Sequence, residues 1–167
     1  EKKVKKTNFN KKKIILFVGP RIGYKNFINL LQAFAKSNYL KTNFKIVCFG
    51  GGKPNFEEMR LIQKLGLKRN IIFENGNDNK LNDFYKVSSL YISTSLFEGF
   101  GLTTLEAMRM GCPVICSNIP VFKEILEDAC YYVEPKNIDN IKNKLERLLR
   151  SKKEQKKLIK KGYRIVL

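Results

Sequence analysis

The sequence of 167 residues contains no histidine. A serine or cysteine nucleophile activated by histidine is therefore excluded within this chain, and the commonest zinc ligand is missing as well. Cysteine is scarce, because only Cys48, Cys112, Cys116 and Cys130 occur, each in or beside an apolar run. The spacing of Cys112 and Cys116 suggests a metal pair, but "GCPVICS" is typical of a strand with small buried side chains. We expect reduced structural thiols and no metal.

Long apolar runs are also missing. No stretch approaches the roughly 18 residues that a membrane-spanning helix needs, and the start, "EKKVKKTNFNKKK", is not that of a signal peptide. We therefore expect a cytoplasmic protein. The first residue is Glu rather than Met, so we expect a piece of a longer protein. Residues 1–13 are interpreted as a basic leader or linker, and residues 14–167 as one domain with a core of its own.

Acidic residues are few, with 15 Asp and Glu against 33 Lys and Arg, which gives a net charge of +18. Such a charge can indicate nucleic acid, anionic lipid or a phosphorylated ligand. However, lysine greatly outnumbers arginine, the residue that nucleic-acid readers favour for bidentate contacts. A general drift of composition toward Lys, Asn and Ile is the simpler explanation. We expect no nucleic acid, while a peripheral contact with an anionic membrane is compatible with the charge.

Apolar runs of strand length alternate with amphipathic segments along nearly the whole chain. The expected strands are 14–19, 44–50, 70–75, 89–94, 112–117 and 130–134. The expected helices are 26–37, 56–67, 80–88, 103–110, 121–126 and 137–150, with stops at Gly66 and Gly111. The last segment, 151–167, is expected to be helical at first and then to end abruptly. Because the strands are continuously apolar, both faces of the sheet should be covered by helices. The sequence predicts an α/β fold, doubly wound, with a mainly parallel sheet.

Ligands of such folds bind at the carboxyl ends of the strands. This rule places three loops on one edge: 19–26 ("GPRIGYKN"), 50–55 ("GGGKPN") and 93–101 ("STSLFEGFG"). We therefore expect these three loops to lie together and to form the binding site.

The first loop offers two cations before a helix that should start near Asn26. A helix N-terminus suits a phosphate, and the planar fork of Arg21 with the point charge of Lys25 would suit a diphosphate. The alternative is two solvated cations in a lysine-rich protein, and this loop alone does not choose. Neither a P-loop nor a dinucleotide fingerprint is present.

The stretch "SLFEGFGLTTLEAM" places Glu98 and Glu106 on either side of "GFGLTTL". Glycines there permit positive φ and close approach of backbone N–H groups to a ligand. With a helix beginning around Leu102 or Thr103, Glu98 projects from the loop and Glu106 lies about one turn into the helix. Each carboxylate could accept hydrogen bonds from sugar or ribose hydroxyls. The alternatives are a loop cap for Glu98 and an ordinary surface glutamate for Glu106.

Three stretches together resemble the C-terminal half of a family 4 glycosyltransferase: "FVGPRIGYKNFINLLQAF", "SLYISTSLFEGFGLTTLEAMRMGCPVICSNIPVFKEIL" and "CYYVEPKN". The resemblance extends from about residue 14 to about residue 150. It implies a retaining enzyme of the GT-B fold, whose two Rossmann-like halves enclose the active site. This chain would be the donor-binding half of an enzyme that moves a hexose-type sugar from a nucleotide diphosphate sugar to an acceptor, in polysaccharide or glycolipid biosynthesis. The Y-K-N form of the first loop most resembles members that act on mannose-type sugars.

The resemblance also implies roles for single residues. Glu98 would face the donor sugar and is the candidate catalytic residue. Arg21 and Lys25 would hold the diphosphate and stabilise the leaving nucleotide in place of a metal, and Glu106 would bind the ribose hydroxyls. The remaining donor-binding residues would be Gly19, Gly99, Phe100, Gly101, Leu102 and Thr103. The loop that touches the base would be Asn75, Gly76 and Asn77.

Two mechanisms stay open. Retention could use Glu98 as a nucleophile that forms a glycosyl-enzyme, as in retaining glycosidases. Alternatively the acceptor attacks on the face that the nucleotide leaves, and Glu98 only positions the sugar, which the resemblance favours. No metal and no other cofactor are expected.

The expected partners are a GDP-, UDP- or ADP-linked sugar and an N-terminal acceptor domain that is missing here, together with its histidine and the terminal helix that crosses back to it. The chain alone should bind nucleotide weakly, transfer nothing and tend to self-associate. Two other classes remain: a GT-B enzyme that modifies nucleotide sugars, such as an epimerase, and a non-catalytic basic module that binds nucleic acid or membrane.

Overall fold

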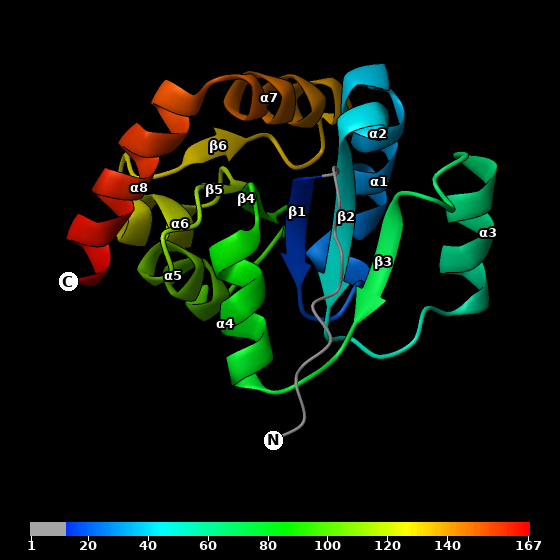
Figure 1. The fold of residues 1–167 in the computed structure, drawn as a ribbon, viewed down its shortest axis with the longest axis horizontal. Helices are drawn as coiled ribbons and strands as arrows, with labels where there is room; N and C mark the ends of the chain where they lie inside the picture. Colours follow the sequence, from blue (N-terminus) through cyan, green and yellow to red (C-terminus); the bar gives the residue numbers. More distant parts are fainter. Residues whose placement is uncertain (1–12) are drawn as a thin grey trace.

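The computed structural model describes residues 13–167, so the expected basic leader lies outside the described residues except for Lys13. Six strands form one sheet in the order β3-β2-β1-β4-β5-β6 (Figure 1). Every pair of neighbouring strands is parallel. The strands are β1 (Lys13–Val18), β2 (Phe44–Phe49), β3 (Ile71–Glu74), β4 (Leu90–Ser93), β5 (Val114–Ser117) and β6 (Tyr131–Val133). The predicted doubly wound α/β fold is confirmed, and its strand order reverses between β1 and β4, where such folds bind ligands.

Helices connect the strands and cover both faces of the sheet. They are α1 (Phe27–Ala35), α2 (Asn38–Asn43), α3 (Phe56–Lys64), α4 (Asp78–Val87), α5 (Leu102–Arg109), α6 (Pro120–Leu126), α7 (Ile138–Arg150) and α8 (Lys152–Val166), with a short 3₁₀ helix, η1 (Gly23–Lys25), after β1. Figure 1 shows α3 beyond β3 at one edge of the sheet and α8 beside α5 and α6 at the other end.

The core has two parts, one on each face of the sheet. Ile15 and Phe17 of β1 pack in the part built with α1 and α7, whereas Ile14 and Leu16 pack in the part built with α4 and α5. Successive residues of a strand point to opposite faces. A strand covered on both faces must therefore be apolar at every position, which explains the continuous apolar runs.

Local capping explains where the helices begin and end. The Asn55 side chain accepts a hydrogen bond from Glu58 N while the Glu58 side chain accepts one from Asn55 N, a capping box at the start of α3. The predicted stops at Gly66 and Gly111 are confirmed, because their φ values of 69° and 72° lie in the left-handed region that ends helices.

Two segments differ from the expectations. The short helix α2 was not predicted, because its six residues carry too little apolar periodicity, and only Ser37, whose side chain accepts a hydrogen bond from Leu40 N, marks its start. The expectation that the last segment ends abruptly was wrong, since α8 continues through Gly162 to Val166. Gly162 lies against Met108 of α5, so packing between helices outweighs the weak helix propensity of glycine.

The four cysteines are buried free thiols, as expected. Cys116 lies on β5, and its Sγ is 3.3 Å from Cys130 Sγ. Within residues 13–167, no group of three or more His, Cys, Asp or Glu side chains is arranged to hold a metal ion. None of the helices in that range is both long enough and apolar enough to cross a membrane.

Candidate functional site

The loop after β1 and the loop after β4 meet at the carboxyl edge of the sheet, as predicted. Leu96 N donates to Tyr24 O at 2.7 Å, and the Thr94 hydroxyl contacts the carbonyls of Lys25 and Asn26 at 3.2 and 3.1 Å. The loop after β2 joins the same group, because the Arg21 guanidinium donates to Gly50 O at 2.9 Å. The first loop therefore contacts both of the other loops singled out in the sequence.

Asn26 is a site residue that the sequence argument did not single out. Its φ of 55° is left-handed, a conformation that asparagine tolerates better than most residues. Its side-chain amide donates to Thr94 O at 3.0 Å and to Pro135 O at 2.7 Å. Asn26 thus joins three loops at the point where η1 ends and α1 begins. The available signal was an asparagine directly after the last loop cation.

Lys25 and Glu98 form the central ion pair of the site. Lys25 Nζ lies 2.6 Å from Glu98 Oε1, and the Ser95 hydroxyl donates to the same oxygen at 2.6 Å. The two charged side chains are 15% and 14% exposed, so they are mostly shielded and still reachable from solvent. The structure therefore pairs Lys25, which was expected to bind the diphosphate, with Glu98, which was expected to face the donor sugar.

Arg21 has different partners. Its Nε donates to Glu58 Oε1 at 2.9 Å, and its terminal nitrogens donate to the carbonyls of Gly50, Gly52 and Gly51 at 2.9, 3.0 and 3.4 Å. These contacts use four of the five N–H donors of a guanidinium. The side chain is 2% exposed and lies 4.9 Å from the centre of the Phe73 ring. Arg21 and Lys25, expected as one basic pair, are thus held by separate groups.

The glycine loop explains how three carbonyls reach one arginine. Gly50, Gly51 and Gly52 all have positive φ, between 72° and 81°. A Cβ at Gly51 would lie 2.7 Å from Gly19 O and 2.9 Å from the Arg21 guanidinium. Only glycine permits both this conformation and this close approach.

The helix α5 begins at Leu102, within the predicted range, with Gly101 as its N-cap at a φ of 75°. A Cβ at Gly101 would lie 2.5 Å from the Phe122 ring. Glu106 is exposed one turn into the helix, as expected. The Tyr85 hydroxyl lies 3.2 Å from Glu106 Oε2 and 3.1 Å from Thr103 O. Glu106 is therefore held by a buried tyrosine of α4 that was not among the predicted site residues.

Most of the remaining candidates are solvent-facing, whereas Gly19 and Thr103 are half-buried. Phe100 and Leu102 are 55% and 62% exposed, next to exposed Gly99. The predicted base loop is also exposed: Asn77 caps α4 through Lys80 N at 3.1 Å, and Asn75 O accepts from Lys80 Nζ at 2.9 Å. Other large apolar side chains are exposed in the loops of the same edge, namely Ile22, Tyr24, Leu96 and Phe97.

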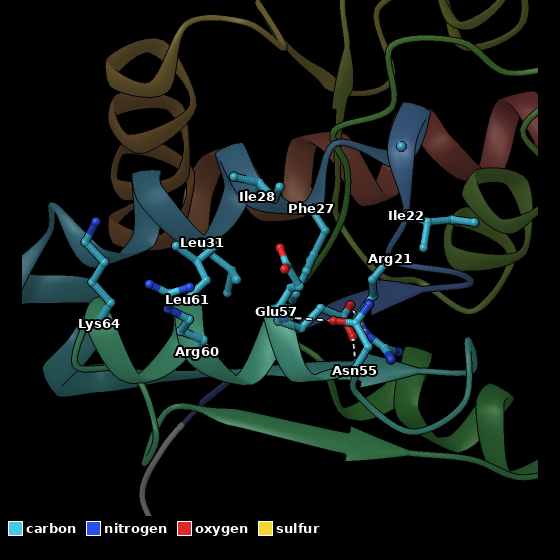
Figure 2. Close-up of a pocket in the computed structure, with 12 residues that line it drawn as sticks. Arg21, Ile22, Phe27, Ile28, Leu31, Asn55, Glu57, Arg60, Leu61 and Lys64 are labelled. Atoms are coloured by element: carbon cyan, nitrogen blue, oxygen red, sulfur yellow. Dashed lines mark hydrogen bonds and ion pairs between the residues drawn. The ribbon is translucent and has the colours of Figure 1, made fainter.

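A separate hollow of about 450 Å³ lies between α1 and α3. Figure 2 shows Phe27, Leu31 and Leu61 inside it and Arg21 at one end. Neither Lys25 nor Glu98 lines this hollow, and its walls are mainly apolar. It adjoins the predicted site, with which it shares Arg21 and Asn55, but it does not include the Lys25–Glu98 pair.

Comparison with known proteins identifies the family. The family described as "Glycosyl transferases group 1" matches residues 1–165. An uncharacterized glycosyltransferase of Methanocaldococcus jannaschii, MJ1607, is 32% identical over 140 residues, which are 82% of this chain and 36% of that protein. O-antigen chain mannosyltransferase B of Escherichia coli is 32% identical over 130 residues, 75% of this chain and 34% of the relative.

Solved structures agree as well. Sucrose-phosphate synthase of Thermosynechococcus elongatus matches with a TM-score of 0.82 and 25% identity over 93% of this chain and 40% of that one. The C-terminal domain of the group 1 protein LpcC from Francisella tularensis matches with a TM-score of 0.80 and 28% identity over 92% of this chain and 84% of that domain. The chain spans about a third of the length of the two curated relatives. It belongs to the group 1 glycosyl transferases.

Proposed function

We propose that the chain is the donor-binding half of a retaining family 4 glycosyltransferase. In this proposal it binds a nucleotide diphosphate sugar whose hexose-type unit passes to an acceptor held by a second domain. One observation carries the proposal: in a member of the group 1 family, Lys25 and Glu98 form a shielded ion pair at 2.6 Å, beside the glycine-bounded start of α5.

Lys25 supplies the positive charge for the diphosphate. Without ligand its ammonium group is paired with the Glu98 carboxylate. When the donor binds, the ammonium group can turn toward a phosphate oxygen. The first N–H groups of α5 add partial positive charge, because no side chain caps that helix. Together they would stabilise the charge that develops on the leaving nucleotide, the role that a metal has in other transferases.

A direct contact between Arg21 and the diphosphate requires one further step. The guanidinium must exchange Glu58 or the glycine carbonyls for phosphate oxygens, because four of its five donors are engaged. Nucleotide binding by a Glu58→Gln variant tests this step. Glu106 is assigned to the ribose and residues 75–77 to the base, while Gly19, Gly99 and residues 100–103 form the wall of the donor site.

Glu98 faces the donor sugar in this proposal. As a carboxylate beside the anomeric carbon it could act as a nucleophile, or it could position the sugar by accepting hydrogen bonds while the acceptor attacks on the departing face. The ion pair with Lys25 and the hydrogen bond from Ser95 favour positioning, because both lower the nucleophilicity of Oε1.

The net charge of +18 suits a peripheral contact of the whole enzyme with an anionic membrane that carries a lipid-linked acceptor.

Calorimetric titration of the chain with GDP, UDP and ADP tests the proposal. We expect one of them to bind, and Lys25→Ala to weaken that binding by roughly tenfold, the value of a charge-assisted hydrogen bond. Lys36→Ala is the matched control, because Lys36 is 53% exposed and pairs with Asp139. Absence of binding to all three nucleotides, together with tight and salt-sensitive binding to DNA, would overturn the proposal in favour of a basic binding module.

A further inference from the structure

Tyr85 and Glu106 come from neighbouring helices and meet beneath the proposed ribose site. Tyr85 is fully buried on α4, whereas Glu106 is exposed on α5. The Tyr85 hydroxyl is 3.2 Å from Glu106 Oε2 and 3.1 Å from Thr103 O. A single hydroxyl proton is thus shared between a side chain that can reach solvent and the backbone of the first turn of α5.

The hydroxyl of Tyr85 remains a donor at all physiological pH values. Burial raises its pKa well above the ordinary tyrosine value, and the neighbouring Tyr91 and Glu106 raise it further. Because the tyrosine stays protonated, its interaction with the Glu106 carboxylate is a charge-assisted hydrogen bond, which is stronger than one between neutral groups.

An exposed glutamate without such a partner samples several rotamers, and a ligand that uses it must order them. In this chain one carboxylate oxygen of Glu106 accepts the Tyr85 hydrogen bond, and no hydrogen bond or ion pair to the other oxygen, Oε1, is formed within residues 13–167. A carboxylate fixed in this way can accept hydrogen bonds from both hydroxyls of a ribose at a lower entropic cost.

We propose that Tyr85 is a positioning residue that holds Glu106 toward the ribose, so that the chain distinguishes ribonucleotides from nucleotides without ribose hydroxyls. The inference rests on the proposed function, because it takes Glu106 as the ribose ligand. It adds a buried residue that touches no substrate and that sets the sugar selectivity of the nucleotide site. Tyr85 also lies on the helix that follows the proposed base loop, residues 75–77, so base and ribose recognition share one support.

Tyr91 provides a matched control. Its ring is 5.9 Å from that of Tyr85, and its buried hydroxyl shares a hydrogen bond of 2.8 Å with Thr103 Oγ1. Tyr91→Phe therefore removes a buried hydroxyl of the same cluster, and with it a hydrogen bond to Thr103, the residue of α5 that Tyr85 also contacts. It removes no contact to Glu106. A purely structural effect of losing a tyrosine hydroxyl should appear in both variants.

The experiment measures dissociation constants for whichever of GDP, UDP and ADP the unmutated chain binds, and for its 2′,3′-dideoxy analogue. We expect the unmutated chain to prefer the ribonucleotide by roughly tenfold or more, as a hydrogen bond to a charged group implies. Tyr85→Phe and Glu106→Gln should each lower this ratio to about twofold or less, and the double variant should lower it no further, because both act on one contact. Tyr91→Phe should keep the full ratio.

The outcomes distinguish the positioning role of Tyr85 from the proposed nucleotide binding on which it rests. A Tyr85→Phe chain that keeps the unmutated ratio, while Glu106→Gln loses it, would overturn the positioning role alone. A Glu106→Gln chain that keeps the ratio would remove the ribose assignment and the inference with it. An equal loss of ratio in Tyr91→Phe and Tyr85→Phe would assign the effect to general loosening of α5. Failure of the unmutated chain to bind any nucleotide would be a failure of the proposed function.

Discussion

Arg21 and Glu58 form a buried ion pair that joins the loop after β1 to the first turn of α3, with Nε 2.9 Å from Oε1. The same carboxylate accepts a hydrogen bond from Asn55 N at 2.8 Å and so caps α3. Since Arg21 also binds the carbonyls of the glycine loop, this one pair fixes two of the three loops at the carboxyl edge. The position of Lys25, four residues along the same loop, depends on it.

Replacing Arg21 should therefore destabilise the fold. Arg21→Met leaves Glu58 without its cation and three carbonyls without donors, so we expect the free energy of unfolding to fall by about 3 kcal/mol, as for a buried pair that loses one partner. Lys36→Met, at a pair whose side chains are 53% and 61% exposed, should change it by less than about 1 kcal/mol. Urea denaturation of both variants measures the difference.

Nucleotide binding by a milder variant, Glu58→Gln, shows whether Arg21 only supports its loop or also contacts the phosphate. Glu58→Gln keeps one of the two acceptor oxygens, which now serve Arg21 Nε and Asn55 N separately, and removes the negative charge that pairs with Arg21. If Arg21 only supports the loop, the affinity for the bound nucleoside diphosphate should stay within about twofold of the unmutated value. If Arg21 exchanges Glu58 for phosphate, the affinity should rise, because that exchange no longer breaks an ion pair. Calorimetry with the same nucleotide distinguishes the two.

Two glycines of the loop before α5 should respond very differently to alanine. Gly101 has a φ of 75°, and a Cβ there would lie 2.5 Å from the Phe122 ring, whereas a Cβ at Gly99 meets nothing within 4 Å. We expect Gly101→Ala to lower the free energy of unfolding by about 2 kcal/mol or more and Gly99→Ala by less than about 0.5 kcal/mol. Adding Phe122→Leu should make the double variant less destabilised than the sum of the two single changes. Equal effects at the two glycines would contradict the described start of α5.

The buried thiol of Cys48 predicts a loss of stability at alkaline pH. Burial raises the pKa of Cys48 far above the ordinary value, although the nearby Arg21 opposes this. Below the pKa of the unfolded thiol, about 8.5, both states keep the proton and the free energy of unfolding is unaffected. Above this pH only the unfolded state releases the proton, so the free energy of unfolding falls as pH rises. By pH 10 the loss should be about 2 kcal/mol relative to pH 7.5, at 1.36 kcal/mol per unit. A Cys48→Ala chain should lack this part of the slope, and parallel pH profiles for the two chains would contradict the prediction.

The sequence was a sufficient basis for the fold, because each strand is a continuous apolar run and Gly66 and Gly111 end their helices where predicted. It was not sufficient for the helix α2, whose six residues depend on the Ser37 cap. Nor could it predict how α8 continues through Gly162, because this depends on contact with α5.

The site shows the same division between local pattern and tertiary contact. The meeting of the three loops follows from the parallel topology alone. The pairing of Lys25 with Glu98 joins residues 73 positions apart, and no local pattern contains it. The glycine triplet was interpreted as part of a binding edge, yet its carbonyls face Arg21, a direction that only the left-handed backbone reveals. The support of Glu106 by Tyr85 was hidden because an apolar helix position predicts burial and says nothing of the hydroxyl.

The proposed role of Glu98 can be tested in an enzyme that also carries the proposed acceptor domain. Glu98→Ala should reduce transfer by at least about a hundredfold, because it removes a charged group at the reacting sugar. Nucleotide binding should be unchanged or tighter, since the charge of Lys25 is released from its 2.6 Å partner. Glu98→Gln then separates the mechanisms: an amide cannot form a glycosyl-enzyme but can still hydrogen-bond the sugar, so substantial residual transfer supports positioning and complete loss supports a nucleophile. Ser95→Ala removes only the second hydrogen bond to Oε1 and should cause a modest loss. Near-normal turnover of Glu98→Ala would remove Glu98 from the active site.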